Sequence, residues 1–221
     1  MADHPTLFSG PMICALLEGR KTQTRRILKV PSASLLRAAE HDGGQGLLQL
    51  SRFAKADRLW CRELLRKADG IWRYDADKVP AVVTPDHPRF ADMIAWTDRK
   101  EASVCPGIHM PRWASRLTLI VTDVRVERLQ DISEADAIAE GIEDVTAEVA
   151  PSDKSLRFWR RYRDGGWNGY VNCPIGSYAS LWSEINGPGS WAENPWAVAV
   201  SFAVERRNID AREEVRHASG T

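Results

Sequence analysis

The chain has 221 residues, of which 43% are hydrophobic and 27% are charged, so a packed core is expected and disorder is not. Thirty basic and thirty acidic residues cancel, which argues against a protein that coats nucleic acid non-specifically but allows a local basic site. Residues 1–11 lack the pattern of a signal peptide, and no apolar run approaches the roughly 18 residues that a membrane span needs. We therefore expect a cytoplasmic protein with no membrane contact.

The N-terminal half of the chain is predicted to begin with a short buried helix at residues 10–17. Pro11 suits the first turn of this helix, and Gly19 suits a left-handed C-terminal cap. An extended segment is expected next, at residues 20–28, and a short strand is predicted at 58–64.

The C-terminal half contains the clearest strand, at residues 116–129, where apolar side chains alternate. Ser133 then opens a helix as the first residue of a capping box, and Gly141 closes it. Apolar residues spaced at three, four and seven predict an amphipathic helix at 178–185. A second alternating strand is predicted at 196–205.

The order of these elements is too irregular for a doubly wound parallel sheet, so we predict an α+β or mainly β fold. A small antiparallel β-barrel with helices at its mouth fits the long amphipathic strands, and the two longest strands should be neighbours in a closed or nearly closed barrel. One domain is expected at residues 1–205, with inserted loops at about 66–105 and 143–172. A polar, charged tail follows at 206–221.

The cysteines give no indication of a metal site. All four are widely spaced and none forms a Cys-x-x-Cys pair, so they are expected to be reduced and mostly buried. Cys105 and His109 lie four residues apart, and His41 and His87 could join them around zinc. This spacing matches no common zinc pattern, and no metal and no cofactor are predicted.

Residues 20–26 form the most unusual stretch, because four of the seven side chains are cationic and the other three can hydrogen-bond. One interpretation is a solvated edge strand whose charges discourage aggregation. The other is a nucleic-acid or base-binding segment, in which Arg20, Arg25 and Arg26 contact the ligand and Arg25 or Arg26 contacts phosphate. The sequence leaves both interpretations open.

Glu140 stands in the last turn of the helix that Ser133 opens, where a carboxylate meets the negative end of the helix dipole. A locally unfavourable residue of this kind often marks a functional site or a salt bridge. The alternative is an ordinary surface glutamate.

A loop rich in basic and aromatic residues precedes the strand at 116–129. His109, Arg112, Trp113 and Arg116 could stack on and hydrogen-bond a base there. The alternative is a turn directed by prolines, with Trp113 in the core.

Several motifs together resemble the ASCH family, a branch of the PUA-like superfold, and especially its longer bacterial and phage-derived members. The most specific is LEGRKTQTRR at residues 17–26, and DRLWCRE at 57–63 supports it. Weaker matches lie at residues 109–116, 117–126, 132–134, 140–141 and 196–205. Ala56 stands where the family usually has glycine, and the insertions are not covered.

The resemblance implies a PUA-like barrel with a cleft that binds RNA or a modified nucleoside, with DNA as an alternative. One small bacterial branch with a similar first motif hydrolyses the acetyl amide of N4-acetylcytidine. Its catalytic lysine, threonine and glutamate match Lys21, Thr24 and Glu140 of this chain. A regular strand would place Lys21 and Thr24 on opposite faces, so this triad requires a bend between them.

The leading hypothesis is therefore a nucleic-acid or modified-nucleobase binding ASCH domain protein, with an amidohydrolase acting on N4-acylated cytidine as the candidate enzyme. The alternatives are a non-catalytic protein that recognises RNA or a modified base, a ribonuclease-type ASCH protein, and a phage structural or assembly factor.

Overall fold

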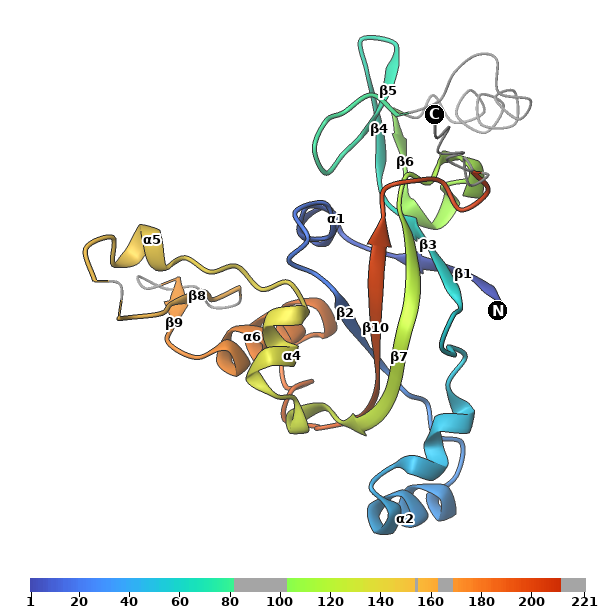
Figure 1. Cartoon of the computed structure of the whole chain (residues 1–221), viewed down its shortest axis with the longest axis vertical. Helices are drawn as coiled ribbons and strands as arrows, with labels where there is room; N and C mark the ends of the chain where they lie inside the picture. Colours follow the sequence, from blue (N-terminus) through green and yellow to red (C-terminus); the bar gives the residue numbers. More distant parts are fainter. Residues whose placement is uncertain (82–102, 154, 163–168, 212–221) are drawn as a thin grey trace, which may run out of the picture. The chain divides into compact units, whose positions relative to one another are not determined.

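The computed structural model describes residues 1–81, 103–153, 155–162 and 169–211 (Figure 1). Its contacts divide the chain into two compact units. Unit 1 comprises residues 1–2, 11–57 and 120–204, and unit 2 comprises 3–10, 58–119 and 205–221. In the described part of the chain, no helix has both the length and the apolar character that crossing a membrane requires.

Unit 1 is built on three strands in the order β7-β10-β2. They are β7 (Thr118–Arg128), β10 (Trp196–Glu205) and β2 (Gln23–Ile27). The first five residues of β10 are buried, so this strand lies at the centre of the core. The prediction that the two longest strands are neighbours is confirmed. β2 runs antiparallel to β10, with Thr24 opposite Val200.

The helices of unit 1 are α1 (Gly10–Leu17), α2 (Ala33–Asp42), α4 (Glu134–Ala139), α5 (Thr146–Val149) and α6 (Pro174–Asn186). Two of them, α1 and α4, begin and end close to the residues that the capping pattern predicts. The Ser133 hydroxyl accepts a hydrogen bond from the Asp136 amide at 3.1 Å and so caps α4, as expected. α4 and α6 pack together over a core that includes Ile132, Tyr178 and Trp182.

Unit 2 contains shorter strands around a second core. β1 (Asp3–Leu7) runs parallel to β3 (Arg58–Arg62), which confirms the strand predicted near residue 58. The other strands are β4 (Leu65–Ala68), β5 (Ile71–Tyr74) and β6 (Val104–Cys105), with β4 in the middle. Apolar side chains from these strands and from the following short 3-10 turns form the core, which includes Leu65, Trp72, Tyr74, Cys105 and Met110.

The fold is mixed α+β with a multi-stranded sheet, and the prediction of a closed barrel is wrong. β7 passes through both units, and the hydrogen-bonded strand order is β1-β3-β7-β10-β2, which has two ends. At the β2 end, the two residues before the strand pair with the end of α4. The Thr22 amide donates to the Ala139 carbonyl at 2.8 Å, and Lys21 pairs with Glu140 in an isolated antiparallel bridge.

Of the expected insertions, the first contributes most of β4 together with β5 and β6, and the second contributes α5 with the two-residue strands β8 (Trp159–Arg160) and β9 (Tyr170–Val171). Residues 82–102, 154, 163–168 and 212–221 lie outside the described residues, and they include parts of both insertions and most of the expected tail. The boundaries of a single domain at 1–205 stay a prediction.

The buried thiol of Cys105, in the unit 2 core, should lower the free energy of unfolding at alkaline pH. Burial raises the pKa of its thiol to about 11, although Arg62 opposes the shift. A raised folded-state pKa means that the stabilisation is complete below the unfolded-state pKa, near 8.5, and is lost as pH rises toward 11. We expect Cys105→Ala to remove about 2 kcal/mol of the fall in unfolding free energy between pH 8.5 and 11. Urea titrations at several pH values measure this slope, and equal slopes for both proteins would contradict the prediction.

Candidate functional site

The basic segment at residues 20–26 is largely buried. Lys21 is completely inaccessible, Thr24 is 3% exposed and Arg25 is 4% exposed. The interpretation of a solvated edge strand is therefore wrong for these residues. Lys21 lies just before β2, where its amide donates to the Ala15 carbonyl of α1 at 3.0 Å. The chain thus reaches β2 through contacts with the ends of two helices.

The Lys21 side chain ends on Glu140, the residue that caps the C-terminus of α4. The ammonium donates to Glu140 Oε2 at 2.9 Å and to the Glu140 carbonyl at 2.8 Å, and the Glu140 side chain is 4% exposed. Burial, helped by the positive charges of Arg26 and Arg25, lowers the pKa of Lys21, and Glu140 opposes this shift. The unfavourable position of Glu140 at a helix C-terminus is thus explained by a buried ion pair.

Gly141 allows Lys21 to lie close to the end of α4. Its φ is +87°, a left-handed conformation that favours glycine. A Cβ atom at this position would lie 2.8 Å from Lys21 Cβ and 3.1 Å from Ala15 Cβ. The backbone after α4 therefore packs directly on the lysine that α4 binds.

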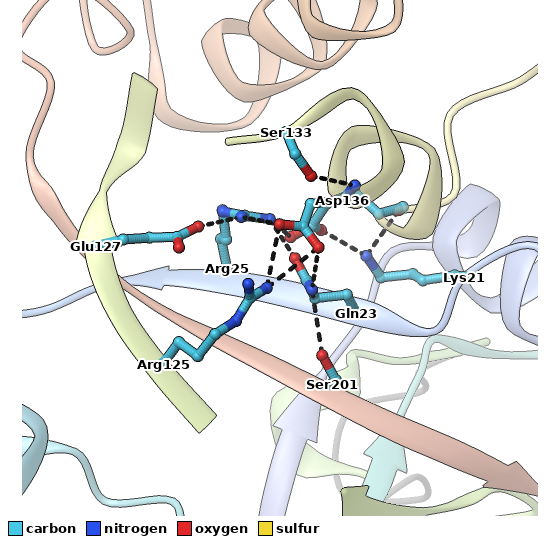
Figure 2. A network of polar contacts seen from close by, with 9 residues as sticks. Lys21, Gln23, Arg25, Arg125, Glu127, Ser133, Asp136 and Ser201 are labelled. Atoms are coloured by element: carbon cyan, nitrogen blue, oxygen red, sulfur yellow. Dashed lines mark hydrogen bonds and ion pairs between the residues drawn. The ribbon is translucent and has the colours of Figure 1, made fainter. Parts of the chain in front are cut away.

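Arg25 is the centre of a second set of ionic contacts, shown in Figure 2. Its side chain is inaccessible and donates to Gln23 Oε1, to Glu127 Oε1 and, at 3.3 Å, to Asp136 Oδ2. Arg25 Nη1 also lies 3.6 Å from Glu140 Oε1, beyond hydrogen-bond distance. One arginine therefore links three carboxylates, and its positive charge is shared among them.

Asp136 connects this network to the surface. It accepts from Gln23 Nε2 at 3.0 Å and from Arg125 Nη2 at 3.1 Å (Figure 2). Burial would raise the pKa of Asp136, but these hydrogen bonds and the charges of Arg125 and Arg25 hold it below its usual value. Asp136 is therefore a carboxylate at neutral pH.

A cavity of about 80 Å³ adjoins the network in unit 1. Its polar wall includes Thr24, Arg26, Glu140 and Tyr178. The remaining lining residues are mostly apolar and come largely from α6: Met12, Arg25, Ile27, Leu181, Trp182, Ile185 and Asn186. Burial and the nearby Glu140 charge raise the pKa of the Tyr178 phenol well above its usual value, so it stays protonated.

Glu140, a lining residue of the cavity, has one carboxylate oxygen without a hydrogen bond from the described residues. Glu140 Oε1 is buried and accepts no hydrogen bond from the described part of the chain, whereas Oε2 is bound by Lys21. A buried acceptor without a donor is costly, and such atoms often mark a place where a ligand or water binds. The cavity thus combines a carboxylate acceptor, a guanidinium, a phenol and a hydroxyl with an apolar side.

The structure brings two members of the predicted triad into contact and places the third beside the same cavity. Lys21 binds Glu140, and both Thr24 and Glu140 line the cavity. Within residues 1–81, 103–153, 155–162 and 169–211, no hydrogen bond joins the Lys21 amine to the Thr24 hydroxyl. Lys21 lies before β2, in an isolated bridge with Glu140, and the bend between Lys21 and Thr24 that the triad requires stays a prediction.

Among the other predicted binding residues, Arg20 in unit 1 donates to the Gly141 carbonyl at 2.8 Å and pairs with Glu18. The rest belong to unit 2. Arg112 pairs with Asp3 and Asp210, and Arg116 forms a bidentate pair with the buried Glu63 while its guanidinium lies over the Tyr74 ring.

The two remaining loop residues differ in exposure. Trp113 packs against the unit 2 core, in agreement with the core alternative, and His109 is exposed. No group of three metal-ligating side chains that could hold an ion is found among the described residues, and His87 lies outside them.

The sequence did not indicate the parts that Tyr178, Glu127 and Asp136 have in this site. Tyr178 follows the apolar spacing of α6, so the sequence pattern predicts a core residue. Its phenol becomes part of the site because the fold places α6 beside Glu140. Glu127 and Asp136 lie on a strand and in a helical first turn where acidic residues are common.

Comparison of the chain with protein-family models, with curated proteins and with solved structures found no match. The resemblance to the ASCH family therefore stays a prediction from the motifs, and the function has to be argued from the site.

Proposed function

We propose that this protein binds a single nucleobase, as a modified nucleoside or within RNA, in the cavity beside β2 and α6. The observation that carries the proposal is Glu140, a buried carboxylate in the cavity lining whose Oε1 accepts no hydrogen bond from the described residues. A base edge that presents an N–H group would satisfy this oxygen. Arg26, Thr24 and the Tyr178 phenol offer donors for the carbonyl and ring-nitrogen acceptors of the same base.

The size and chemistry of the cavity support a small planar ligand. Its volume of about 80 Å³ is well below the roughly 300–1,000 Å³ of ordinary ligand sites, so it has no room for several stacked nucleotides. Trp182, Leu181 and Met12 supply an apolar side against which a flat ring would pack.

The reaction that best suits these residues is hydrolysis of an N4-acylated cytidine. The Thr24 hydroxyl would attack the acyl carbon, and Lys21, whose pKa burial lowers, would take the hydroxyl proton. The acyl C–N bond would break as N4 of cytosine takes up a proton, and water would then release the acid from Thr24. For the first step, the Lys21 ammonium has to lose a proton, release Glu140 and approach Thr24 as the free amine.

That requirement favours a second candidate, a protein that recognises the base without chemical change. Lys21 makes two hydrogen bonds to Glu140, at 2.8 Å and 2.9 Å, and such a buried pair is costly to separate. In this alternative, Lys21 serves to hold Glu140 in place for ligand binding.

Incubation with N4-acetylcytidine, cytidine and short acetylated RNAs, read by mass spectrometry and calorimetry, separates the two candidates. We expect N4-acetylcytidine to bind, and Thr24→Val to abolish release of acetate while changing affinity less than about tenfold, because the valine has nearly the volume of threonine and lacks the nucleophile. Binding without acetate release by the wild-type protein would identify the non-catalytic alternative. Absence of binding to every compound would contradict the proposed function.

A further inference from the structure

Glu140 Oε1 accepts no hydrogen bond from the described residues, although the buried Arg25 guanidinium lies 3.6 Å away. A charge-assisted hydrogen bond between these groups would be about 2.7–2.9 Å long, so a movement of about 0.7 Å would form it. Attraction between the opposite charges favours that movement. Some other contact must hold the guanidinium back.

The other contacts of Arg25 account for the restraint. Each terminal nitrogen of a guanidinium carries two protons. On Arg25, Nη2 donates to both Glu127 and Asp136, and Nη1 donates to Gln23. Both acids approach Nη2, whereas Glu140 Oε1 lies 3.6 Å from Nη1. A closer approach to Glu140 would lengthen these bonds.

We propose that Glu127 and Asp136 are positioning residues, which hold Arg25 away from Glu140 Oε1 so that this oxygen stays open to an N–H group of the bound base. The inference rests on the proposed function for its ligand and deepens it, because it identifies the ligand as one that donates an N–H to a carboxylate. It also assigns Arg25 to the support of the site, in place of contact with phosphate.

Neighbouring side chains hold Asp136 in place. Gln23 Nε2 donates to Asp136 Oδ1 and lies 3.2 Å from Ser201 Oγ, and Arg125 donates to both Asp136 oxygens at 3.1 Å (Figure 2). These bonds orient Asp136 toward Arg25. The Glu127 and Asp136 side chains are 21% and 19% exposed, so they can be changed with less effect on packing than Arg25 itself.

The test is the double variant Glu127→Gln/Asp136→Asn, which keeps the shapes of both side chains and removes their charges. Glu134→Gln is the matched control, because Glu134 also lies in the first turn of α4 but is exposed. Crystal structures of the three proteins give the separation between Arg25 Nη1 and Glu140 Oε1. Calorimetry gives the affinity for N4-acetylcytidine and for its N4-methylated derivative, which lacks the N–H.

In the double variant, we expect the separation to fall below 3.2 Å and the affinity for N4-acetylcytidine to fall at least tenfold, because one charge-assisted hydrogen bond is lost. The preference of the wild-type protein for the N–H compound should disappear with it. The control should match the wild type in both measurements. A separation that stays near 3.6 Å, or an unchanged preference between the two compounds, would overturn the inference.

Two further measurements cover a double variant that does not fold and a wild-type protein that binds no nucleoside. If the double variant does not fold, Glu127→Gln alone should show a smaller change in the same direction, and no change in separation would count against the inference. If the wild-type protein binds none of the nucleosides, the proposed function fails, and the separation measured in the variant crystals still decides whether the two acids restrain Arg25.

Discussion

Glu140→Ala is expected to lower the free energy of unfolding by about 3–5 kcal/mol, the usual cost of removing one partner of a buried ion pair. Lys21 is completely buried and its ammonium bonds to Glu140 Oε2. Without the carboxylate, the ammonium keeps a bond to the backbone carbonyl of residue 140 but loses its counter-charge. Arg25 loses one of its three carboxylates in the same step. Urea unfolding at neutral pH measures the loss.

Two controls separate the ion pair from other effects of the substitution. Glu134→Ala, on the exposed side of the same helix, should change stability by no more than about 0.5 kcal/mol. Replacing both partners, as Lys21→Met/Glu140→Leu, should recover much of the loss, because no uncompensated ammonium stays buried. A loss below about 1 kcal/mol for Glu140→Ala, or a double variant as unstable as the single one, would contradict this account.

The elements that the sequence predicted well are those with local signals. The capping serine of α4, the helix α6 and the strand β10 were each predicted from neighbouring residues, and the structure confirms these elements, although the first five residues of β10 are all buried and do not alternate. Strand β1 has no such signal. Its five residues, DHPTL, include Pro5 and only one apolar side chain at the end, and it forms by parallel pairing with β3 more than fifty residues away.

Barrel closure was wrongly predicted for a related reason. Whether a sheet closes depends on what lies beside its edge strands, and alternation within a strand carries no information about that. Here the chain before β2 pairs with the end of α4 through Thr22 and Lys21. This contact joins residues more than a hundred positions apart, and no motif in either segment indicates it.

The site was predictable where a residue conflicted with its local environment. Glu140 at a helix C-terminus and the concentration of cations at 20–26 both stood out, and the structure joins them. Whether a cation contacts ligand or protein was not predictable, because it depends on which carboxylates surround it in space. Arg25 illustrates this, since Glu127, Asp136 and Glu140 come from three different parts of the chain.

Gly141→Ala should destabilise the protein by about 2–5 kcal/mol, through two separate costs. A left-handed conformation costs an L-residue roughly 1–2 kcal/mol, and Gly141 has a φ of +87°. The new methyl group would also lie 2.8 Å from Lys21 Cβ and 3.3 Å from Lys21 Cα. Overpacking of this kind typically costs about 1–3 kcal/mol, and here it would press on the lysine that binds Glu140.

Gly19→Ala provides the matched control for Gly141→Ala, because it has the first cost without the second. Gly19 has a φ of +77°, and a Cβ atom there would meet nothing within 4 Å. We therefore expect Gly19→Ala to lose about 1 kcal/mol in urea unfolding, clearly less than Gly141→Ala. Equal losses would mean that backbone strain alone explains both glycines and that the close approach to Lys21 has no energetic role. A larger loss at Gly141, together with weaker binding of N4-acetylcytidine, would link this packing contact to the position of Glu140 and hence to the ligand.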